Sequence, residues 1–232
     1  VCNFTKPTKS KPSLLTFNEV TTLFHEFGHA LHGMMAKGTY ESLSGTSVFW
    51  DFVELPSQIF ENWCYEKECL DLFAKHYETG EKIPEDLIKQ ASNFQQGYQT
   101  LRQISFGLLD MAYHSKDPSE VTSISAFEKE VMKPTDLLPK VPGTLMSTSF
   151  SHIFQGGYSS GYYSYKWAEV LDADAFELFQ EKGVFDKATA DSFVKNVLSA
   201  GGSEHPSILY KRFRGREPQQ DALLKRAGLI SE

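Results

Sequence analysis

Hydrophobic residues recur at every third or fourth position through most of this chain of 232 residues, which is the spacing of one helical face. The pattern is clearest after Thr16, where the apolar positions are Val20, Leu23, Phe24, Phe27, Leu31 and Met34. Thr16 and Glu19 have the spacing of a capping box, and Gly38 can end a helix. The pattern therefore predicts an amphipathic helix over residues 16–37 whose apolar stripe faces the core.

Helical patterns continue along the rest of the chain, and the alternating pattern typical of strands is rare. Pro84 suits the first turn of a helix, Asp186 can cap another, and Pro56 is expected to interrupt a third. The expected helices cover residues 51–77, 84–94, 98–112 and 125–132, a stretch from a loop at 155–161 to about residue 182, residues 186–201, and a final helix from about residue 218. The chain is predicted to be mainly α, with at most a few short strands.

Composition narrows the class of protein. A hydrophobic fraction of 41% and a charged fraction of 23% are ordinary for a globular chain, and 232 residues can bury a sizeable core. The formal net charge of -7 argues against a nucleic-acid surface. The three cysteines lack C-x-x-C spacing, so free thiols in a reducing compartment are expected. The sequence has no apolar run long enough to predict a membrane span.

The helix expected over residues 16–37 carries the motif H-E-x-x-H, formed by His25, Glu26 and His29. Residues four apart lie on one helical face, about 6 Å apart along the axis, so two imidazoles there can bind one Zn²⁺ ion. Glu26 lies next to the position left open for water and can take a proton from it. The plainer alternative is a pair of surface histidines beside a solvated glutamate. We interpret the motif as the centre of a zinc peptidase.

A catalytic zinc site of this kind needs a third protein ligand. His32 is poorly placed for it, because it lies about 10.5 Å along the helix axis from His25. The metzincin pattern is also absent, since positions 32 and 35 hold His and Met where that pattern has Gly and His. His32 is therefore expected to be structural or to support a ligand. The histidines outside the motif are expected to be structural: His76, His114 and His205.

Three carboxylates downstream remain candidates for the third ligand. Asp51, Glu54 and Glu61 have spacings that could place all three on one face of the helix expected there. Spacing does not choose among them. Asp51 and Glu61 could instead orient His25 or His29 by accepting a hydrogen bond from a ring N–H group.

Short motifs around these residues resemble a known family. Residues 25–29 read HEFGH, residues 43–46 read LSGT and residues 51–58 read DFVELPSQ. Together they resemble the thimet oligopeptidase family of zinc metallopeptidases, and most of all its bacterial peptidyl-dipeptidase (dipeptidyl carboxypeptidase) branch. The resemblance implies that one Zn²⁺ ion per chain is bound by His25, His29 and Glu54.

Further motifs extend the resemblance to the end of the chain. Residues 150–152 (FSH), 156–158 (GGY) and 161–167 (GYYSYKW) match the family's Gly/Tyr-rich substrate loop, and residues 213–218 (FRGREP) and 221–224 (DALL) match its C-terminus. The loop glycines, which would allow it to move over a bound peptide, are Gly156, Gly157 and Gly161. Tyr163, by contrast, is expected to pack in the core.

The resemblance also implies roles for side chains of this loop. Tyr165 is expected to stabilise the oxyanion that forms when the peptide carbonyl is attacked, and such a donor can lower the barrier by about 2.7–4 kcal/mol. Tyr158, Tyr162 and Gly157 are expected to bind the substrate. His152 is expected to form a hydrogen bond with the substrate or with an intermediate.

The predicted function is zinc-dependent hydrolysis of peptide bonds in short peptides, with release of C-terminal dipeptides and with Glu26 as the base. The alternatives are an oligopeptidase that cleaves internal bonds, and a zinc-binding fragment that is inactive alone. Family members are longer, and residues 1–4 resemble a strand from their interior. Residues 1–232 are therefore expected to be the C-terminal catalytic portion of a larger enzyme whose N-terminal region is absent. The expected location is the cytoplasm, with the periplasm as an alternative.

Overall fold

The computed structural model describes residues 1–231, and for residues 89 and 91–93 it describes the backbone alone. Within that range the regular structure is helical, and an isolated bridge pairs Lys75 with Lys82. The prediction of a mainly α chain with at most a few short strands is confirmed. Residues 1–4, expected to resemble a strand, have no regular structure. Among the described residues, no helix combines the length and the apolar character needed to cross a membrane.

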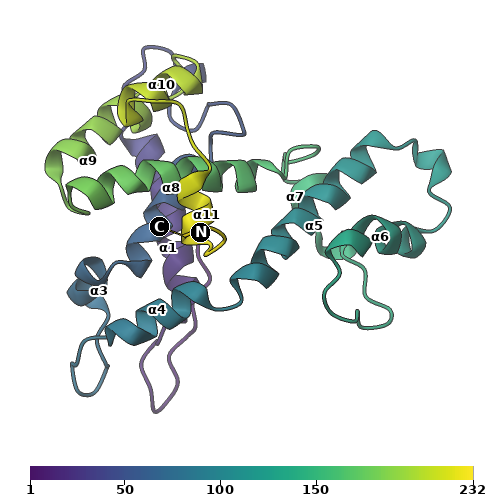
Figure 1. The fold of residues 1–232 in the computed structure, drawn as a ribbon, viewed down its shortest axis with the longest axis horizontal. Coiled ribbons are helices and arrows are strands. Elements are labelled where there is room, and N and C mark those ends of the chain that lie inside the picture. Colours follow the sequence, from purple (N-terminus) through teal and green to yellow (C-terminus); the bar gives the residue numbers. More distant parts are fainter. Residues whose placement is uncertain (232) are drawn as a thin grey trace. The chain divides into compact units, whose positions relative to one another are not determined.

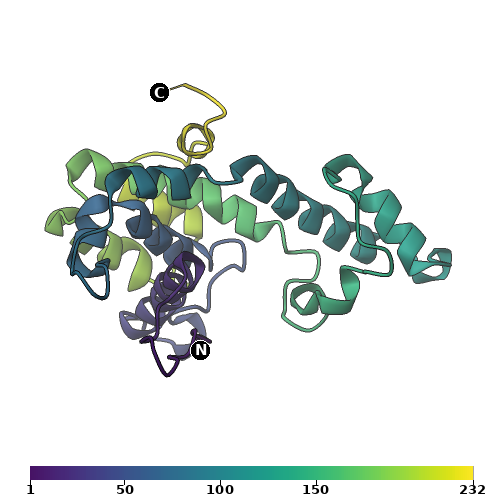
Figure 2. The same cartoon turned by 90° about the horizontal axis from the view of Figure 1, so that it is seen from below.

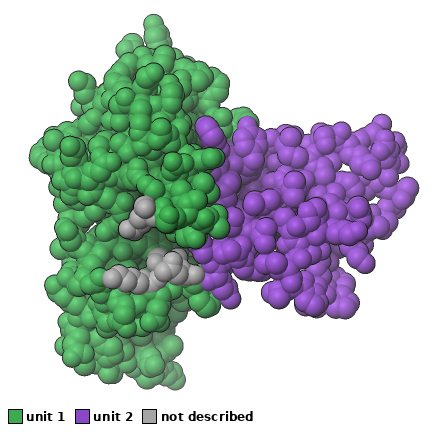
Figure 3. Space-filling model, viewed as in Figure 1, with its two compact units in different colours: residues 1–94, 168–232 green, residues 95–167 purple. Residues whose placement is uncertain are grey.

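Figure 1 shows the helices along the chain. They are α1 (Phe17–Met34), α2 (Leu55–Glu61), α3 (Lys67–Phe73), α4 (Glu85–Asn93), α5 (Gln96–Ser115), α6 (Ile124–Met132), α7 (Ser151–Phe154), α8 (Ser164–Lys182), α9 (Lys187–Phe193), α10 (Pro206–Arg214) and α11 (Asp221–Arg226). The 3₁₀ turn η2 (Asn62–Tyr65) follows α2. The chain divides into two compact units, coloured separately in Figure 3: unit 1 contains residues 1–94 and 168–232, and unit 2 contains residues 95–167.

The start of α1 follows from its local sequence. The Thr16 side chain accepts a hydrogen bond from the Glu19 N–H group (3.3 Å), and the Glu19 carboxylate accepts one from the Thr16 N–H group (2.7 Å). The predicted capping box is therefore confirmed. The helix ends at Met34, earlier than predicted. Beyond it the Lys37 N–H group donates to the carbonyl of Ser199 (3.0 Å), a tertiary contact that takes the place of a helical one.

The predicted core-facing stripe of α1 is wrong for three of its six members. Leu23, Phe27 and Met34 are 40%, 51% and 65% exposed, whereas the buried positions of the helix are Gly28 and His32. The backbone of α2 approaches the Gly28 side, because glycine lets two backbones come close where a larger side chain would hold them apart. The buried side of this helix is thus determined by its smallest residue.

The helix predicted over residues 51–77 is instead three shorter elements, α2, η2 and α3. α2 begins at Leu55 with Pro56 in its first turn, so the proline starts a helix and does not interrupt one. A proline in the first turn loses no hydrogen bond, because the N–H groups there have no partner inside the helix. This start places Glu54 at the N-cap position of α2.

The core of unit 1 forms around α8. Trp63 of η2 packs edge-on against Phe176 and Phe179 of α8, with ring centroids 4.8 and 5.0 Å apart. Phe193 of α9 and Phe213 of α10 join the same cluster and contact each other at 5.1 Å. Figures 1 and 2 show α9 and α10 beside α8. The core therefore collects elements from both stretches of chain that form unit 1.

A polar group joins η2, α8 and α11 within unit 1, and we call it the Asp172 cluster. The Arg226 guanidinium donates to the Asp172 carboxylate (2.5 Å) and to the side-chain oxygen of Asn62 (2.6 Å). The Asn62 amide donates to the same Asp172 oxygen (2.9 Å). Asp172 is buried, so these donors compensate a carboxylate that has been removed from water. The cluster fixes the chain at the end of α2.

The C-terminal motif that begins at residue 213 has a structural role. Arg214 donates from Nε to the Asp174 carbonyl (2.8 Å), and Arg216 pairs with the Asp174 carboxylate (2.6 Å). The same carboxylate accepts a hydrogen bond from the buried Tyr210 hydroxyl. These contacts fasten α10 and the residues after it to α8.

Unit 2 is built on α5, α6 and α7. Its core contains Phe106, Leu109, Phe150, Ile153 and Tyr162. Glu128 of α6 is buried there and accepts hydrogen bonds from the N–H groups of Met146 (2.8 Å) and Ser147 (2.9 Å). Burial alone would raise the pKa of Glu128, but the hydrogen bonds from Ser147 and Met146 outweigh it and hold the pKa below its ordinary value.

Candidate functional site

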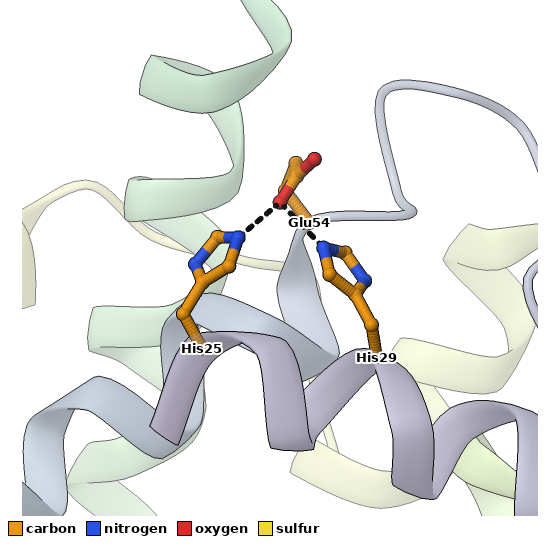
Figure 4. A group of neighbouring side chains, drawn as sticks. All are labelled: His25, His29 and Glu54. Carbon is orange, nitrogen blue, oxygen red and sulfur yellow. Dashed lines mark ion pairs between the residues drawn. The ribbon is translucent and has the colours of Figure 1, made fainter. Parts of the chain in front are cut away.

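Three potential metal ligands meet where α1 contacts α2. His25 and His29 project from the same face of α1, and Glu54 reaches both rings from the N-cap of α2 (Figure 4). Oε2 of Glu54 lies 3.3 Å from Nε2 of His25 and 3.2 Å from Nε2 of His29. Glu54 is only 2% exposed. Spacing in the sequence left Asp51, Glu54 and Glu61 as candidates for the third ligand, and the structure places Glu54 beside both histidines.

Close packing of the two helices makes this meeting possible. A Cβ atom on Gly28 would lie 2.6 Å from the Cα atom of Ser57 and 2.9 Å from the carbonyl carbon of Pro56, so only glycine fits there. The Ser57 hydroxyl, which points back along α2, lies 2.8 Å from Oε2 of Glu54 and donates to it. Gly28 sets the separation of the helices, and Ser57 helps to orient the carboxylate.

The spacing of the donor atoms suits zinc. In a tetrahedral site with bonds of roughly 2.0–2.2 Å, any two donor atoms lie about 3.3–3.6 Å apart. The Glu54 oxygen lies at close to this separation from both imidazole nitrogens, and the ligand atoms of the three residues all lie within 4.8 Å of one another. Two histidines and one carboxylate leave a fourth position for water, as in catalytic zinc sites. The residues present therefore fit one metal ion.

Glu61, at the end of α2, is the carboxylate that orients His25. Its Oε1 atom lies 2.7 Å from Nδ1 of His25, on the opposite side of the ring from Glu54. Burial alone lowers the pKa of His25, but the hydrogen bonds to Glu54 and Glu61 outweigh it and raise the pKa to about 10. A metal ion would replace the proton on Nε2 and leave the Nδ1–H bond to Glu61 in place. In the described chain, Asp51 makes no such contact with either ring.

Glu26 lies on α1 between the two histidines and is half-buried. Within the described residues it forms no hydrogen bond and no ion pair. Its carboxylate therefore has no structural task, which leaves it available for proton transfer.

His32 lies on α1 one turn after Gly28 and is fully buried. Neither of its ring nitrogens has a hydrogen-bond partner among the described residues. Burial, together with the nearby His29, lowers the pKa of His32 to about 4, so its ring is neutral. It does not belong to the group of potential metal ligands, in line with its predicted structural place.

Four residues predicted to bind or act on the substrate gather in unit 2, and we call them the aromatic cluster. The Tyr165 ring lies 5.1 Å from Tyr158, 5.0 Å from Tyr162 and 6.3 Å from His152, measured between centroids. His152 lies 6.1 Å from Tyr158 and 5.9 Å from Tyr162. Tyr162 is buried, His152 is exposed and the other two are half-buried. The aromatic cluster lies in unit 2, and the potential metal ligands lie in unit 1.

The glycines of the loop before α8 allow close turns. Gly157 has a left-handed conformation with φ of 84°, and a Cβ atom on Gly156 would lie 2.8 Å from the backbone of His152. Tyr163 is 46% exposed, so the prediction that it packs in the core is wrong. Its neighbour Tyr162 takes the core position instead, because the turn directs that side chain inward.

Some residues that support these groups lie inside the sequence motifs, as Gly28 and Ser57 do, and others lie outside them. Asp172 and Asp110 are buried carboxylates outside the motifs, and the N–H groups and side chains of residues 50 or more positions away donate to them. The remaining histidines have structural contacts: His114 lies 2.8 Å from the Asp110 carboxylate, and His76 and His205 accept backbone hydrogen bonds.

Comparison with known proteins gives the family. The family model described as Peptidase family M3 matches residues 1–229. Oligopeptidase A of Escherichia coli (strain K12) is 49% identical over 98% of this chain, and dipeptidyl carboxypeptidase of Salmonella typhimurium is 41% identical over 99%. The thimet-like oligopeptidase of Dictyostelium discoideum is 42% identical over 99%. These matches cover 34%, 34% and 35% of the relatives, so the chain spans about a third of their length.

The comparisons agree with the resemblance carried by the motifs. Relatives named oligopeptidase A and relatives named dipeptidyl carboxypeptidase both match, and identity is higher with the former (49% and 48%) than with the latter (41% and 39%). The family model covers nearly the whole chain, including both the potential metal ligands and the aromatic cluster. The chain belongs to peptidase family M3, a family of metallopeptidases.

Proposed function

We propose that this chain is the catalytic portion of a longer peptidase, which hydrolyses short peptides with one Zn²⁺ ion held by His25, His29 and Glu54. The observation that carries the proposal is the buried Glu54 oxygen, which lies 3.3 and 3.2 Å from one nitrogen of each ring. A buried carboxylate needs a compensating positive charge, and a metal ion bound by Glu54 and the two imidazoles would supply it. Two histidines and one carboxylate are a donor set of catalytic zinc sites, and membership of a metallopeptidase family supports the same reaction.

The ion would polarise the peptide carbonyl and lower the pKa of water at its fourth position. Glu26 would accept a proton from that water and deliver it to the leaving amine. Its place on α1 between two ligands, half-buried and without a structural partner in the described chain, supports this role. Glu61 would keep the His25 ring oriented while the proton moves.

The aromatic cluster would supply the contacts to the substrate. In this proposal the Tyr165 hydroxyl donates to the developing oxyanion, and His152 donates to the substrate or to an intermediate. Tyr158, Tyr162 and Gly157 would contact the peptide, and Tyr162 also packs against Tyr165. The ring contacts among the four side chains support a common task.

The role of Glu26 is tested by the Glu26→Gln substitution. The variant should bind one equivalent of zinc with wild-type affinity and lose at least about 100-fold in kcat on a decapeptide, since proton transfer contributes at least that much. Glu41→Gln, which changes an exposed glutamate of unit 1, is the matched control and should alter neither quantity. Near-normal turnover by Glu26→Gln would contradict the assignment.

The role of Tyr165 is tested in the same assay. Tyr165→Phe should lower kcat by about 100-fold to 1000-fold and leave KM nearly unchanged, because an oxyanion donor acts in the transition state. Tyr98→Phe, a change at a half-exposed tyrosine of α5, is the control. A rise in KM alone would assign Tyr165 to substrate binding and contradict the oxyanion role.

For the mode of cleavage, the higher identity with oligopeptidase A supports hydrolysis of internal bonds, and the dipeptidyl carboxypeptidase matches support release of C-terminal dipeptides as the second candidate. Two decapeptides that differ only in a free or amidated C-terminus separate the modes. Dipeptide release should be lost on amidation, whereas internal cleavage should continue, and product masses identify the bond. Zinc binding without cleavage of either peptide would mean that the rest of the longer protein is needed.

We further propose that the protein acts in the cytoplasm. Support comes from its three free cysteines and from an Arabidopsis thaliana relative named "Probable cytosolic oligopeptidase A", which is 45% identical. Free thiols are typical of reducing compartments. Cell fractionation with an antibody against this chain tests the proposal, and recovery in a periplasmic fraction would contradict it.

A further inference from the structure

Asp110 of α5 is fully buried in unit 2, and its carboxylate has three hydrogen-bonding neighbours. Oδ1 accepts from the Ser160 N–H group (2.9 Å), and Oδ2 accepts from the Tyr162 N–H group (2.8 Å). Nδ1 of His114, one turn along α5, lies 2.8 Å from Oδ1. The other neighbour of that nitrogen is the Asp110 carbonyl oxygen (2.9 Å), also an acceptor, so Nδ1 must carry a proton.

The two backbone donors come from a strained turn. Ser160 has φ of 55°, a left-handed conformation that is uncommon for residues other than glycine. The turn is completed by Gly157, and by the Ser159 hydroxyl, which donates to the Ile153 carbonyl (2.5 Å). A residue in such a conformation persists only where surrounding contacts hold it, and here the contact is a buried carboxylate.

The anchored residues lead directly into the aromatic cluster. Tyr162 belongs to it, and the Tyr165 N–H group donates to the Tyr162 carbonyl (3.3 Å) at the start of α8. The rings of Tyr162 and Tyr165 lie 5.0 Å apart. A displacement of the backbone at Tyr162 would therefore move the Tyr165 ring as well.

We propose that Asp110 is a positioning residue that fixes the loop of residues 156–163 and thereby places Tyr162 and Tyr165 for the substrate. The last part rests on the function proposed for these tyrosines. The dependence is mutual, because a buried carboxylate is costly without donors and the loop supplies two of its three. Undocking of the loop would leave the carboxylate with His114 as its remaining donor among the contacts described here.

The Asp110→Asn substitution tests the anchor, since it keeps the size of the side chain but replaces one acceptor oxygen with an NH₂ group. Peptides covering residues 156–163 should exchange hydrogen for deuterium at least about tenfold faster, as expected from losing a hydrogen bond to a charged group. Exchange in α1 and zinc stoichiometry should stay unchanged. Asp117→Asn is the matched control, because Asp117 is an exposed aspartate of the same unit that caps a different turn.

A second pair of variants avoids the buried site, because Ser160 is exposed. Ser160→Val places a β-branched residue in a left-handed conformation and should speed exchange of the loop as Asp110→Asn does. Ser160→Gly keeps the N–H donor and accepts the conformation, so its exchange should stay within about twofold of wild type. The pair decides the question even if Asp110→Asn unfolds unit 2. Unchanged loop exchange in Ser160→Val and in a folded Asp110→Asn protein would overturn the anchor.

Cleavage of an unblocked decapeptide separates the anchor from the function proposed for the tyrosines. If both hold, faster loop exchange is accompanied by a lower kcat and a higher KM, with zinc retained and Asp117→Asn normal. Faster exchange with unchanged kinetics would overturn the placing of the tyrosines for the substrate. Loss of cleavage without faster exchange would overturn the inference as a whole. Because exchange is measured without substrate, the anchor is tested even if the wild-type chain cleaves nothing.

Discussion

Replacing Gly28 with alanine should separate the stability of α1 from the ability to bind metal. Gly28 lies between the two histidines and faces the backbone of α2. A Cβ atom there would lie 2.6 Å from the Cα atom of Ser57 and 2.9 Å from the carbonyl carbon of Pro56. Since ordinary contacts begin at 3.4 Å, the first turn of α2 would have to withdraw by about 1 Å.

Glu54 immediately precedes that turn and would move with it. Its oxygen lies 3.3 and 3.2 Å from the two ring nitrogens, and metal–ligand bonds tolerate changes of only about 0.2 Å. A withdrawal of about 1 Å would remove Glu54 from the donor set. Changes in the residues behind metal ligands already cost about 10–100-fold in affinity, so we expect zinc affinity to fall by about 100-fold or more.

The free energy of unfolding should change much less. Overpacking costs about 1–3 kcal/mol, and alanine in place of glycine in a helix interior contributes about 0.8–1.0 kcal/mol of stability in return. Thermal unfolding followed by circular dichroism measures the change in the free energy of unfolding. Competition with a chromophoric chelator measures zinc affinity on the same preparations.

Gly33→Ala provides the matched control on the same helix. A Cβ atom at that position meets no atom within 4 Å, so the variant should gain up to about 1 kcal/mol of stability and keep wild-type zinc affinity. If Gly28→Ala binds zinc as tightly as Gly33→Ala, the contact between α1 and α2 does not set the position of Glu54 and the reasoning is refuted.

Three further outcomes are expected. Glu61→Ala should lower zinc affinity by about 10–100-fold, because it removes the acceptor that orients His25. Glu61→Gln should lower it less, because the amide oxygen can still accept a hydrogen bond from His25. Equal losses of zinc affinity in a chelator titration would contradict this. Arg226→Ala should lower the free energy of unfolding, measured in urea, by about 1–3 kcal/mol. The loss is smaller than for a fully buried pair because Arg226 is partly exposed. Adding Asp172→Asn to this variant should restore part of the loss, because it removes the unpaired buried charge. Because the pKa of Glu128 is lower in the folded protein, its carboxylate stabilises the fold at pH values above its ordinary pKa of 4.5. This stabilisation is lost as the pH falls through the pKa of the folded state. Thermal melts from pH 7 to pH 3 should therefore show a weaker acid dependence for Glu128→Gln, and identical slopes would refute the assignment.

Elements with local signals could be predicted from the sequence. The capping box of α1 lies within four residues, and Asp186 caps α9 through its hydrogen bond to the Thr189 N–H group as expected. α10 could also have been predicted, since Pro206 occupies its first turn and His205 caps it. In each case the physical cause acts between neighbouring residues, so it is visible in a single stretch of sequence.

The buried side of α1, and which carboxylate lies near His25 and His29, both depend on how α2 packs against α1. Apolar residues occur around much of α1, so hydrophobicity did not show that Gly28 faces α2. The three candidate carboxylates were compared on one assumed helix over residues 51–77. Because α2 begins at Leu55, Asp51 lies outside it, Glu54 lies at its N-cap and Glu61 lies at its far end. The resemblance implies Glu54, and the structure shows that Glu54 lies near both histidines.

Contacts between distant segments carried no sequence signal. Asn62 meets Asp172 at a separation of 110 residues, and Asp110 meets Tyr162 at a separation of 52. Such pairs depend on how each unit folds as a whole. Buried carboxylates are also rare, so the sequence alone does not predict that these two are buried. The candidate site residues and the orienting role of Glu61 could be proposed from the sequence, whereas the buried carboxylates Asp110 and Asp172 could not.

The Asp172 cluster has a consequence for how the protein is made. Arg226 is synthesised 164 residues after its partner Asn62, which follows the end of α2. At about 5–20 residues per second, roughly 10–30 seconds pass between the two. During that interval the nascent chain contains the potential metal ligands but lacks the contacts that later fix the end of α2, and all of unit 2 is synthesised. If His25, His29 and Glu54 bind a metal ion as proposed, tight binding should therefore await the synthesis of Arg226 and its contact with Asp172, and chaperones that shield nascent chains would act in this interval.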